Sequence, residues 1–145
     1  MPDISCYFVG HADTPSSIHP ILYESIQKHI VQYHVNHFYF GNHGGFDRLV
    51  LRTLLELKQQ YPHIHLHMVT PYHPASRSIT IPAGVDELYF PFEQNVFPRY
   101  AIIQANKIMI RSCRYLISYV CHTGKAREFL EYAQHHSIHI SNITE

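Results

Sequence analysis

The stretch Phe38–Asp47, FYFGNHGGFD, decides the fold class of this chain. Its apolar start, Phe38–Phe40, predicts a buried strand, and the apolar residues that recur over Leu49–Leu57 predict a helix. The glycines between them let the backbone turn sharply and approach a ligand closely. A strand that passes through a glycine-rich turn into a helix is typical of a parallel α/β sheet, and the free N–H groups at the start of such a helix can bind an anion.

Strand-like and helix-like segments alternate along the rest of the chain. The expected strands are Ile4–Val9, Phe38–Phe40, His63–Val69, Tyr115–Val120 and Ile138–Ile143, and the expected helices cover residues 20–33, 49–57, 101–109 and 125–136. This alternation predicts βαβ units. At 145 residues, we expect one Rossmann-like α/β domain over residues 1–145. Its sheet should have about five strands, mainly parallel, with helices on both faces.

The segment from Pro71 to Pro98 breaks this pattern. It holds five of the nine prolines, with short apolar pieces at Ile79–Ile81 and Leu88–Phe92. Long loops inside compact domains are typical of functional lids. Its aromatic residues could stack on a base, close a lid or cover a subunit interface; they are Tyr72, Tyr89, Phe90, Phe92 and Phe97. We expect a homo-oligomer, in the first place a symmetric dimer.

Composition narrows the class of protein. The chain is 46% hydrophobic and 15% charged, and its eleven basic residues balance its eleven acidic ones. Because there is no net positive charge and no basic run, we expect no nucleic-acid partner. The three cysteines, Cys6, Cys113 and Cys121, form no CxxC pair, which favours a reducing compartment. No apolar run approaches about 18 residues and no signal segment is recognisable, so we expect a cytoplasmic protein with no membrane partner.

Polar clusters follow four of the expected strands. They are Gly10–Asp13, Gly41–Asp47, Thr70–His73 and Cys121–Lys125. Ligands of open α/β sheets bind beyond the carboxyl ends of the strands, so these clusters should share one edge. The glycines of the second and fourth clusters could equally serve only the tight turns, because neither cluster matches a dinucleotide or P-loop motif. Three glycine sites on one sheet edge favour a ligand pocket.

The residue types in these clusters suggest a phosphate site. We expect the phosphate on Gly44, Gly45 and Thr123–Lys125, with Arg99 as a second positive group. Asn42 and Asp47 would hydrogen-bond a sugar or base, although Asp47 also suits a helix start and Arg99 a solvated first turn. The full set of candidate ligand-binding residues is Gly10, His11, Gly41, Asn42, Gly44, Gly45, Asp47, Arg99, His122, Thr123, Gly124 and Lys125.

We expect no metal site and no bound cofactor. His63, His65 and His67 share one face of a strand, but same-face residues lie nearly 7 Å apart and rarely close on one ion. A polar sheet face is the better interpretation. The pair Cys121-His122 could suggest a thiol nucleophile with its base, but adjacent residues of a strand point to opposite faces.

The chain resembles the SLOG superfamily, named for the SMF/DprA-like and LOG proteins. The resemblance spans nearly the whole chain and rests on short motifs: Gly10-His11, the turn Gly41–Asp47, the segment Pro98–Ile102 leading to Asn106–Met109, and Leu130–Ala133. It implies a Rossmann-like fold, akin to small bacterial members of unknown function, that binds a nucleotide or nucleotide-derived ligand, in some relatives as a sensor.

Other relatives in that superfamily are enzymes that cleave N-glycosidic bonds, such as phosphoribohydrolases. Gly124 and Glu128 keep the spacing of their catalytic loop, while Lys125 replaces a threonine. An N-glycosidase or deoxyribosyltransferase would need a carboxylate near the ribose, for which Glu128 and Glu131 are the candidate catalytic residues. His11, His43 or His122 could handle the proton. The alternative is that both glutamates simply face solvent on the last helix.

Overall fold

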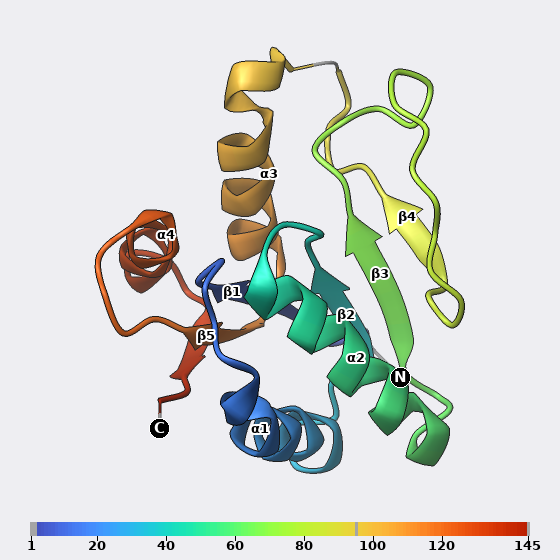
Figure 1. Cartoon of the computed structure of the whole chain (residues 1–145), viewed down its shortest axis with the longest axis vertical. Coiled ribbons are helices and arrows are strands. Elements are labelled where there is room, and N and C mark those ends of the chain that lie inside the picture. The colour runs from blue at the N-terminus through green and yellow to red at the C-terminus, as the bar shows by residue number, and fades with distance from the viewer. Residues whose placement is uncertain (1–2, 95, 145) are drawn as a thin grey trace.

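The computed structural model describes residues 3–94 and 96–144 and shows a Rossmann-like α/β fold (Figure 1). Six parallel strands form one sheet in the order β4-β3-β2-β1-β5-β6. Their bounds are β1 Ser5–Gly10, β2 His37–Phe40, β3 His65–Val69, β4 Glu87–Tyr89, β5 Tyr115–Tyr119 and β6 His139–Asn142.

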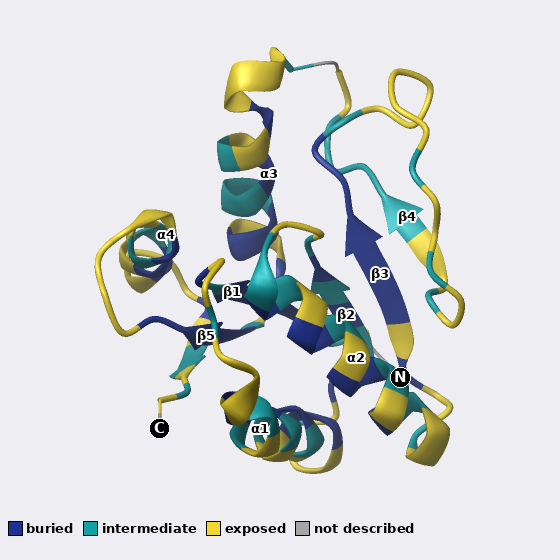
Figure 2. Cartoon of the chain, viewed as in Figure 1, coloured by how far each residue is buried: buried dark blue, intermediate teal, exposed yellow. Residues whose placement is uncertain are grey.

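In the part of the chain that the structure describes, four helices cover the two faces of this sheet. They are α1 His19–Val31, α2 Gly45–Gln60, α3 Pro98–Ser112 and α4 Lys125–Gln134, and a short 3₁₀ helix, η1 Ser16–Ile18, leads into α1. Side chains alternate along β1: Cys6 and Phe8 pack with α1 and α2, whereas Tyr7 and Val9 pack with α3 and α4. Burial follows the same division, since the central strands are buried and the outer helix faces are exposed (Figure 2).

The expected elements are present, with differences in length and number. α2 begins at Gly45, four residues before the first apolar residue of the expected helix, because the turn itself starts the helix. A sixth strand, β4, lies inside the segment that was expected to be loop, where Glu87–Tyr89 pairs with His67–Val69. None of the helices in the described part of the chain has the length and apolar run that a bilayer span requires.

The strand order places a switch point between β1 and β5. From β1 the chain moves outward through β2 and β3 to β4, and α3 then returns it to the other side of β1, where β5 pairs. The loops that follow β1 and β5 therefore diverge to opposite sides of the sheet. A crevice opens between such loops at the carboxyl edge, which is the usual ligand site of open α/β sheets.

The connection from β3 to β4 contains no helix. Residues 70–86 run as turns and extended chain, and in Figure 1 they stand beside β3, away from α1 and α4. Two bonds anchor the far end of this connection: the Asp86 carboxylate accepts from the Leu66 amide at 2.7 Å and from the Lys58 ammonium at 2.5 Å. The segment is thus a structured loop fixed at the sheet edge.

Candidate functional site

A cavity of about 370 Å³ opens at the carboxyl ends of β1, β2, β3 and β5. α3 and α4 supply its apolar wall through Ile102, Ala105, Ala126 and Phe129. Its volume falls in the range of small-molecule sites. Of the residues that the sequence singled out, the cavity is lined by Gly10, His11, Gly41, Asp47, His122, Gly124 and Lys125.

Gly10, Gly41 and Gly124 thus line one space, each with a different reason to lack a side chain. A Cβ on Gly10 would lie 2.2 Å from the ring of Phe46, so this glycine admits the first aromatic residue of α2 into the core. A Cβ on Gly41 would lie 2.8 Å from the Asp47 carboxylate. Gly124 has φ +142 and open space around it, so its backbone is free to meet a ligand.

Gly44 and Gly45 pack against the loop after β1 and do not line the cavity. Gly44 has φ +91, and a Cβ there would lie 2.8 Å from the Ala12 Cα. The Gly45 amide donates to the Ala12 carbonyl at 2.8 Å, and the Phe46 amide donates to the His11 carbonyl at 3.3 Å. These bonds occupy the first amides of α2, so this helix start offers the cavity fewer free donors than the sequence predicted.

The start of α4 is open. Gly124 precedes the helix with no side-chain cap, and the first helical bond runs from the Glu128 amide to the Gly124 carbonyl at 3.2 Å. The amides of Lys125, Ala126 and Arg127 therefore have no partner within the helix. Lys125 is exposed, with its ammonium 3.4 Å from the Glu128 carboxylate. The positive end of the helix and the lysine together form the best anion site of the cavity.

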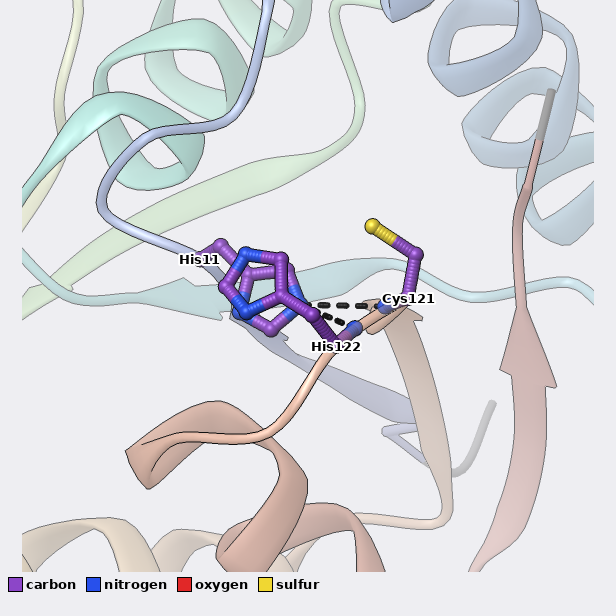
Figure 3. A group of neighbouring side chains, drawn as sticks. All are labelled: His11, Cys121 and His122. Atoms are coloured by element: carbon purple, nitrogen blue, oxygen red, sulfur yellow. Dashed lines mark hydrogen bonds between the residues drawn. The ribbon is translucent and has the colours of Figure 1, made fainter.

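The loops after β1 and β5 are joined by His11 (Figure 3). Its Nε2 accepts from the Cys121 amide at 3.0 Å and from the His122 amide at 3.3 Å, so its proton must sit on Nδ1. Burial, and then the charge of His122, lowers the pKa of His11. His11 is therefore a neutral ring whose hydrogen bonds connect the loop after β1 to the loop after β5.

The surroundings of His122 favour its charged form. Its Nδ1 donates to the Thr123 carbonyl at 2.8 Å and its Nε2 donates to the Asp13 carboxylate at 3.2 Å. The bond to the Thr123 carbonyl, followed by the bond to Asp13, raises the pKa of His122. The bond from His122 lowers the pKa of Asp13 in turn. A histidine that favours protonation thus lines the cavity near the start of α4, paired with the Asp13 carboxylate.

Within residues 3–94 and 96–144, His11, Cys121 and His122 are the one group of three potential metal ligands that lie close together. The two rings are stacked, with planes 10° from parallel and centroids 3.6 Å apart. A metal must lie near the plane of each imidazole that binds it, and no point lies in two parallel planes. The Cys121 sulfur lies on the same side as the rings (Figure 3), within 4.8 Å of a nitrogen of each. As they are stacked, the two imidazoles are unsuited to bind one ion together.

The histidines near β3 contact one another, but within the described residues they form no group of potential metal ligands. His67 Nδ1 donates to the Glu87 carboxylate at 2.6 Å, and the same ring bonds His37 through Nε2 at 2.8 Å. His65 stacks on His37, and His63 precedes the strand beside Tyr61. The expectation of a polar face is only partly met, because His67 is buried under the ring of Tyr39.

Asp47 is the most perturbed carboxyl of the cavity. Burial raises its pKa to about 7, while the bond that it accepts from the His43 amide at 2.9 Å acts in the opposite direction. Its neighbour across the turn is Gly41, which has no side chain to shield it. A carboxyl poised near neutrality inside a cavity can take up or give a proton, as acid–base catalysts do.

The inner end of the cavity is organised by Tyr7. This buried residue of β1 donates through its hydroxyl to Asn106 Oδ1 at 2.7 Å, and Asn106 Nδ2 donates to the Ile102 carbonyl. The bond ties α3 to the sheet beside an apolar wall. Such a wall, with a polar group at its edge, suits a flat heterocycle or a sugar.

The structure does not bring every predicted residue to the cavity. Asn42 lines a neighbouring cavity, Arg99 lies on the first turn of α3 with its guanidinium 5.2 Å from the ring of Tyr100, and Thr123 contributes its carbonyl to His122. Glu128 and Glu131 are exposed on α4 and do not line the cavity. The strand argument about Cys121-His122 is wrong in its premise, because β5 ends at Tyr119 and both residues lie in the loop.

Sequence reasoning missed three contributors: Tyr7, Asp13 and Asn106. In the sequence Tyr7 is indistinguishable from an ordinary core residue, and its hydrogen-bond partner Asn106 is 99 positions away. Asp13 belongs to the polar cluster Gly10–Asp13, but its partner His122 is 109 positions away in the sequence. A carboxylate in the short loop that follows a strand is the one local signal that singles out Asp13.

Comparison with known proteins adds no family to this picture. No protein-family model matches the chain, and no curated protein matches it either.

Proposed function

We propose that this protein is a binding module of the SLOG type that holds a nucleotide or nucleotide-derived ligand at the switch point, as a sensor or signalling domain. The observation that carries the proposal is the single cavity that contains Gly10, Gly41 and Gly124 together with the open start of α4. The phosphate would rest on the amides of residues 125–127 and on Lys125. The base or sugar would lie against the apolar wall of α3 and α4.

Charge supports this orientation of the ligand. Lys125 and His122, whose pKa is raised, lie at the α4 end, whereas the carboxyl of Asp47 lies on the opposite side, at the turn after β2. A phosphate at Asp47 would be repelled by the ionised carboxylate, but a ribose hydroxyl or a base N–H can donate to it. The ligand therefore places its anionic end at α4 and its donor groups at Asp47.

A thermal-shift screen tests the proposal. Nucleoside monophosphates, NAD, ADP-ribose and cyclic nucleotides form the panel, and a ligand that binds the folded state stabilises it by RT ln(1 + [L]/Kd). Lys125→Ala should weaken the binding of the phosphorylated ligand about tenfold, because a charge-assisted contact is lost. Lys28→Ala, on α1 beside Tyr33, is the matched control. A panel without a stabilising compound, or equal affinity in Lys125→Ala, would contradict the proposal.

The perturbed pKa of Asp47 favours a second candidate function, cleavage or transfer at the N-glycosidic bond of a nucleotide. In hydrolysis the C–N bond breaks, water adds its hydroxyl to the sugar carbon, and a proton reaches the leaving base. A carboxyl with a pKa of about 7 can supply that proton at neutral pH. Asp47 then takes the catalytic role for which the sequence offered Glu128 and Glu131.

Chromatography of the bound nucleotide separates the two functions. An enzyme releases free base, and Asp47→Asn abolishes release while binding persists. Glu128→Gln and Glu131→Gln, both outside the cavity, keep their activity in this scheme. Release that depends on Glu128 rather than on Asp47 would overturn the assignment. Binding without release leaves the sensor function.

We also propose a homodimer as the assembly. Phe97, Tyr100 and Ile102, at the start of α3, are 74%, 49% and 38% exposed, which is unusual for large apolar side chains so close together. Burial of this cluster against a second copy would also bring the partner to the wall of the cavity, which Ile102 lines. Light scattering after gel filtration tests it: Tyr100→Glu should yield a monomer, and an unchanged mass would exclude this face.

A further inference from the structure

A second cavity, of about 400 Å³, adjoins the first one. It lies under the start of the β3–β4 connection, and His43, Val69 and Pro71 line both spaces. The two cavities are therefore neighbours along the carboxyl ends of β2 and β3. The proposed function uses only the first cavity.

The chemistry of this second cavity differs from that of the first. Among its described lining residues there is no carboxylate, and the one residue that is always charged is Arg77. Hydroxyl groups come from Ser78 and Thr80, an amide comes from Asn42, and apolar surface comes from the β-strand residue Met68. An exposed cation beside hydrogen-bonding groups, with no competing carboxylate, suits an anionic group.

Arg77 is held in place without an acidic partner. Its guanidinium lies 3.8 Å from the centre of the Tyr72 ring, and in the described part of the chain no carboxylate lies within ion-pair distance of it. A turn that begins at His73 fixes the backbone, because the amides of Ser76 and Arg77 both donate to the His73 carbonyl. Stacking leaves the edge of a guanidinium, where its N–H donors lie, free to bind an oxyanion.

We infer that this second cavity is a subsite for a second anionic group of the same ligand, bound by Arg77. The ligand would be of the two-unit kind, with one phosphate at the start of α4 and a second phosphate or carboxylate at Arg77. That the two groups belong to one molecule rests on the proposed function; that Arg77 binds an oxyanion does not. Both cavities exceed the roughly 300 Å³ that marks the lower end of ligand sites.

Amide NMR with inorganic phosphate as the probe tests the subsite on its own. Phosphate should shift the amides of residues 77–80, and Arg77→Ala should weaken this response at least tenfold while the response of residues 124–127 stays as it was. Arg77→Lys keeps part of the affinity, and Arg52→Ala, an exposed arginine of α2 outside both cavities, changes nothing. Absence of a response at residues 77–80, or its persistence in Arg77→Ala, overturns the subsite. Absence at residues 124–127 alone counts against the proposed function.

Calorimetry tests whether one ligand spans both cavities. A linear diadenosine dinucleotide with a terminal phosphate should bind about tenfold more tightly than AMP, because it adds one charge-assisted contact. Arg77→Ala should remove this gain and leave the affinity for AMP unchanged. A dinucleotide that binds no tighter than AMP, or an equal loss for both compounds in Arg77→Ala, overturns the two-unit ligand.

Discussion

The rings of His11 and His122 stack face to face, with centroids 3.6 Å apart, although they come from loops on opposite sides of the switch point. The His11 ring is neutral because its Nε2 accepts two backbone amides, whereas the His122 ring favours the charged form because both of its nitrogens bond to oxygens. A charged ring on a neutral one is tolerable, whereas two charged rings at this distance repel each other. The stack therefore depends on the two pKa values staying apart.

Imidazole NMR should show His122 titrating above 6.5 and His11 below 6.5, the ordinary value for histidine. In His122→Ala the pKa of His11 should rise, because the opposing charge is gone, yet stay below 6.5, because burial is the larger cause. A pKa of His11 that falls further in this variant would show that the stack does not act through charge.

The same two shifts act on stability with opposite signs. The raised pKa of His122 stabilises the fold below pH 6.5, and this contribution is lost as the pH rises through the folded-state pKa. The lowered pKa of His11 destabilises the fold as the pH falls below 6.5, since the unfolded chain binds that proton more readily. Urea denaturation of His11→Gln and His122→Gln across pH 5 to 8 should separate the two slopes.

Asp47→Asn should stabilise the protein at alkaline pH. Burial raises the pKa of Asp47 from 3.8 to about 7, so the folded state keeps a proton that the unfolded chain releases, and stability falls as the pH rises from about 4 to 7. The amide variant has no charge to bury and should gain on the order of 2 kcal/mol at pH 8, with no gain at pH 4. Thermal unfolding at both pH values measures this difference.

Asp86→Asn is the matched control for that experiment. Asp86 accepts from the Leu66 amide and from the Lys58 ammonium, and the bonds to these two groups outweigh the effect of burial and lower its pKa. Its replacement should therefore destabilise the protein at pH 8, by about 1 kcal/mol. If both variants change stability in the same direction, burial is not what distinguishes Asp47.

Gly44→Ala should be far more harmful than Gly124→Ala. Both glycines have positive φ, but a Cβ on Gly44 would meet the Ala12 backbone at 2.8 Å, whereas a Cβ on Gly124 would meet nothing within 4 Å. We expect losses of about 3 kcal/mol and about 1 kcal/mol in the free energy of unfolding. Equal losses in urea denaturation would mean that backbone strain alone, and not the contact with Ala12, fixes the turn.

Tyr7→Phe should cost about 1 kcal/mol, because the buried hydroxyl donates to Asn106 and the variant leaves that acceptor unpaired. Tyr132→Phe is the control: its hydroxyl accepts from exposed Arg111, and we expect a loss below about 0.5 kcal/mol. Chemical denaturation compares the two. Equal effects would indicate that the bond from β1 to α3 is no stronger than a surface contact.

The sequence was sufficient for the α/β class because periodicity is local. Ile18, Leu22, Ile26 and Ile30 recur on one helical face, and all four are buried against the sheet. β4 was not predicted, because a three-residue strand among prolines shows no periodic pattern of apolar residues. Its pairing with β3 also depends on residues about 20 positions away. Local patterns thus identify elements, while the sheet edge is set by long-range pairing.

The sequence indicates the edge of the sheet at which the cavity lies. It does not show which backbone amides and carboxyls at that edge are available to a ligand. The turns at Gly44 and Gly124 look alike in the sequence. The first amides of α2, after Gly44, donate to the loop that contains Ala12, whereas the first amides of α4, after Gly124, make no such bonds. Likewise, Glu128 and Asp47 are equally good candidates for a functional carboxyl in the sequence. They differ in burial, because Glu128 is exposed and Asp47 is buried. Which amides are already hydrogen-bonded, and which side chains are buried, depend on how the whole chain packs. A local sequence pattern does not contain this information.

The helix-free connection between β3 and β4 has a consequence for how this scaffold can diversify. A crossover helix buries one face against the sheet and so resists exchange, but residues 70–86 give the cavity Tyr72 and Arg77 while remaining largely exposed. Their anchor at Asp86 binds backbone and Lys58 outside the two cavities. The exposed stretch, residues 73–84, can be lengthened, shortened or grafted with little loss of core packing, which makes the lining of the second cavity the most readily re-engineered part of this fold.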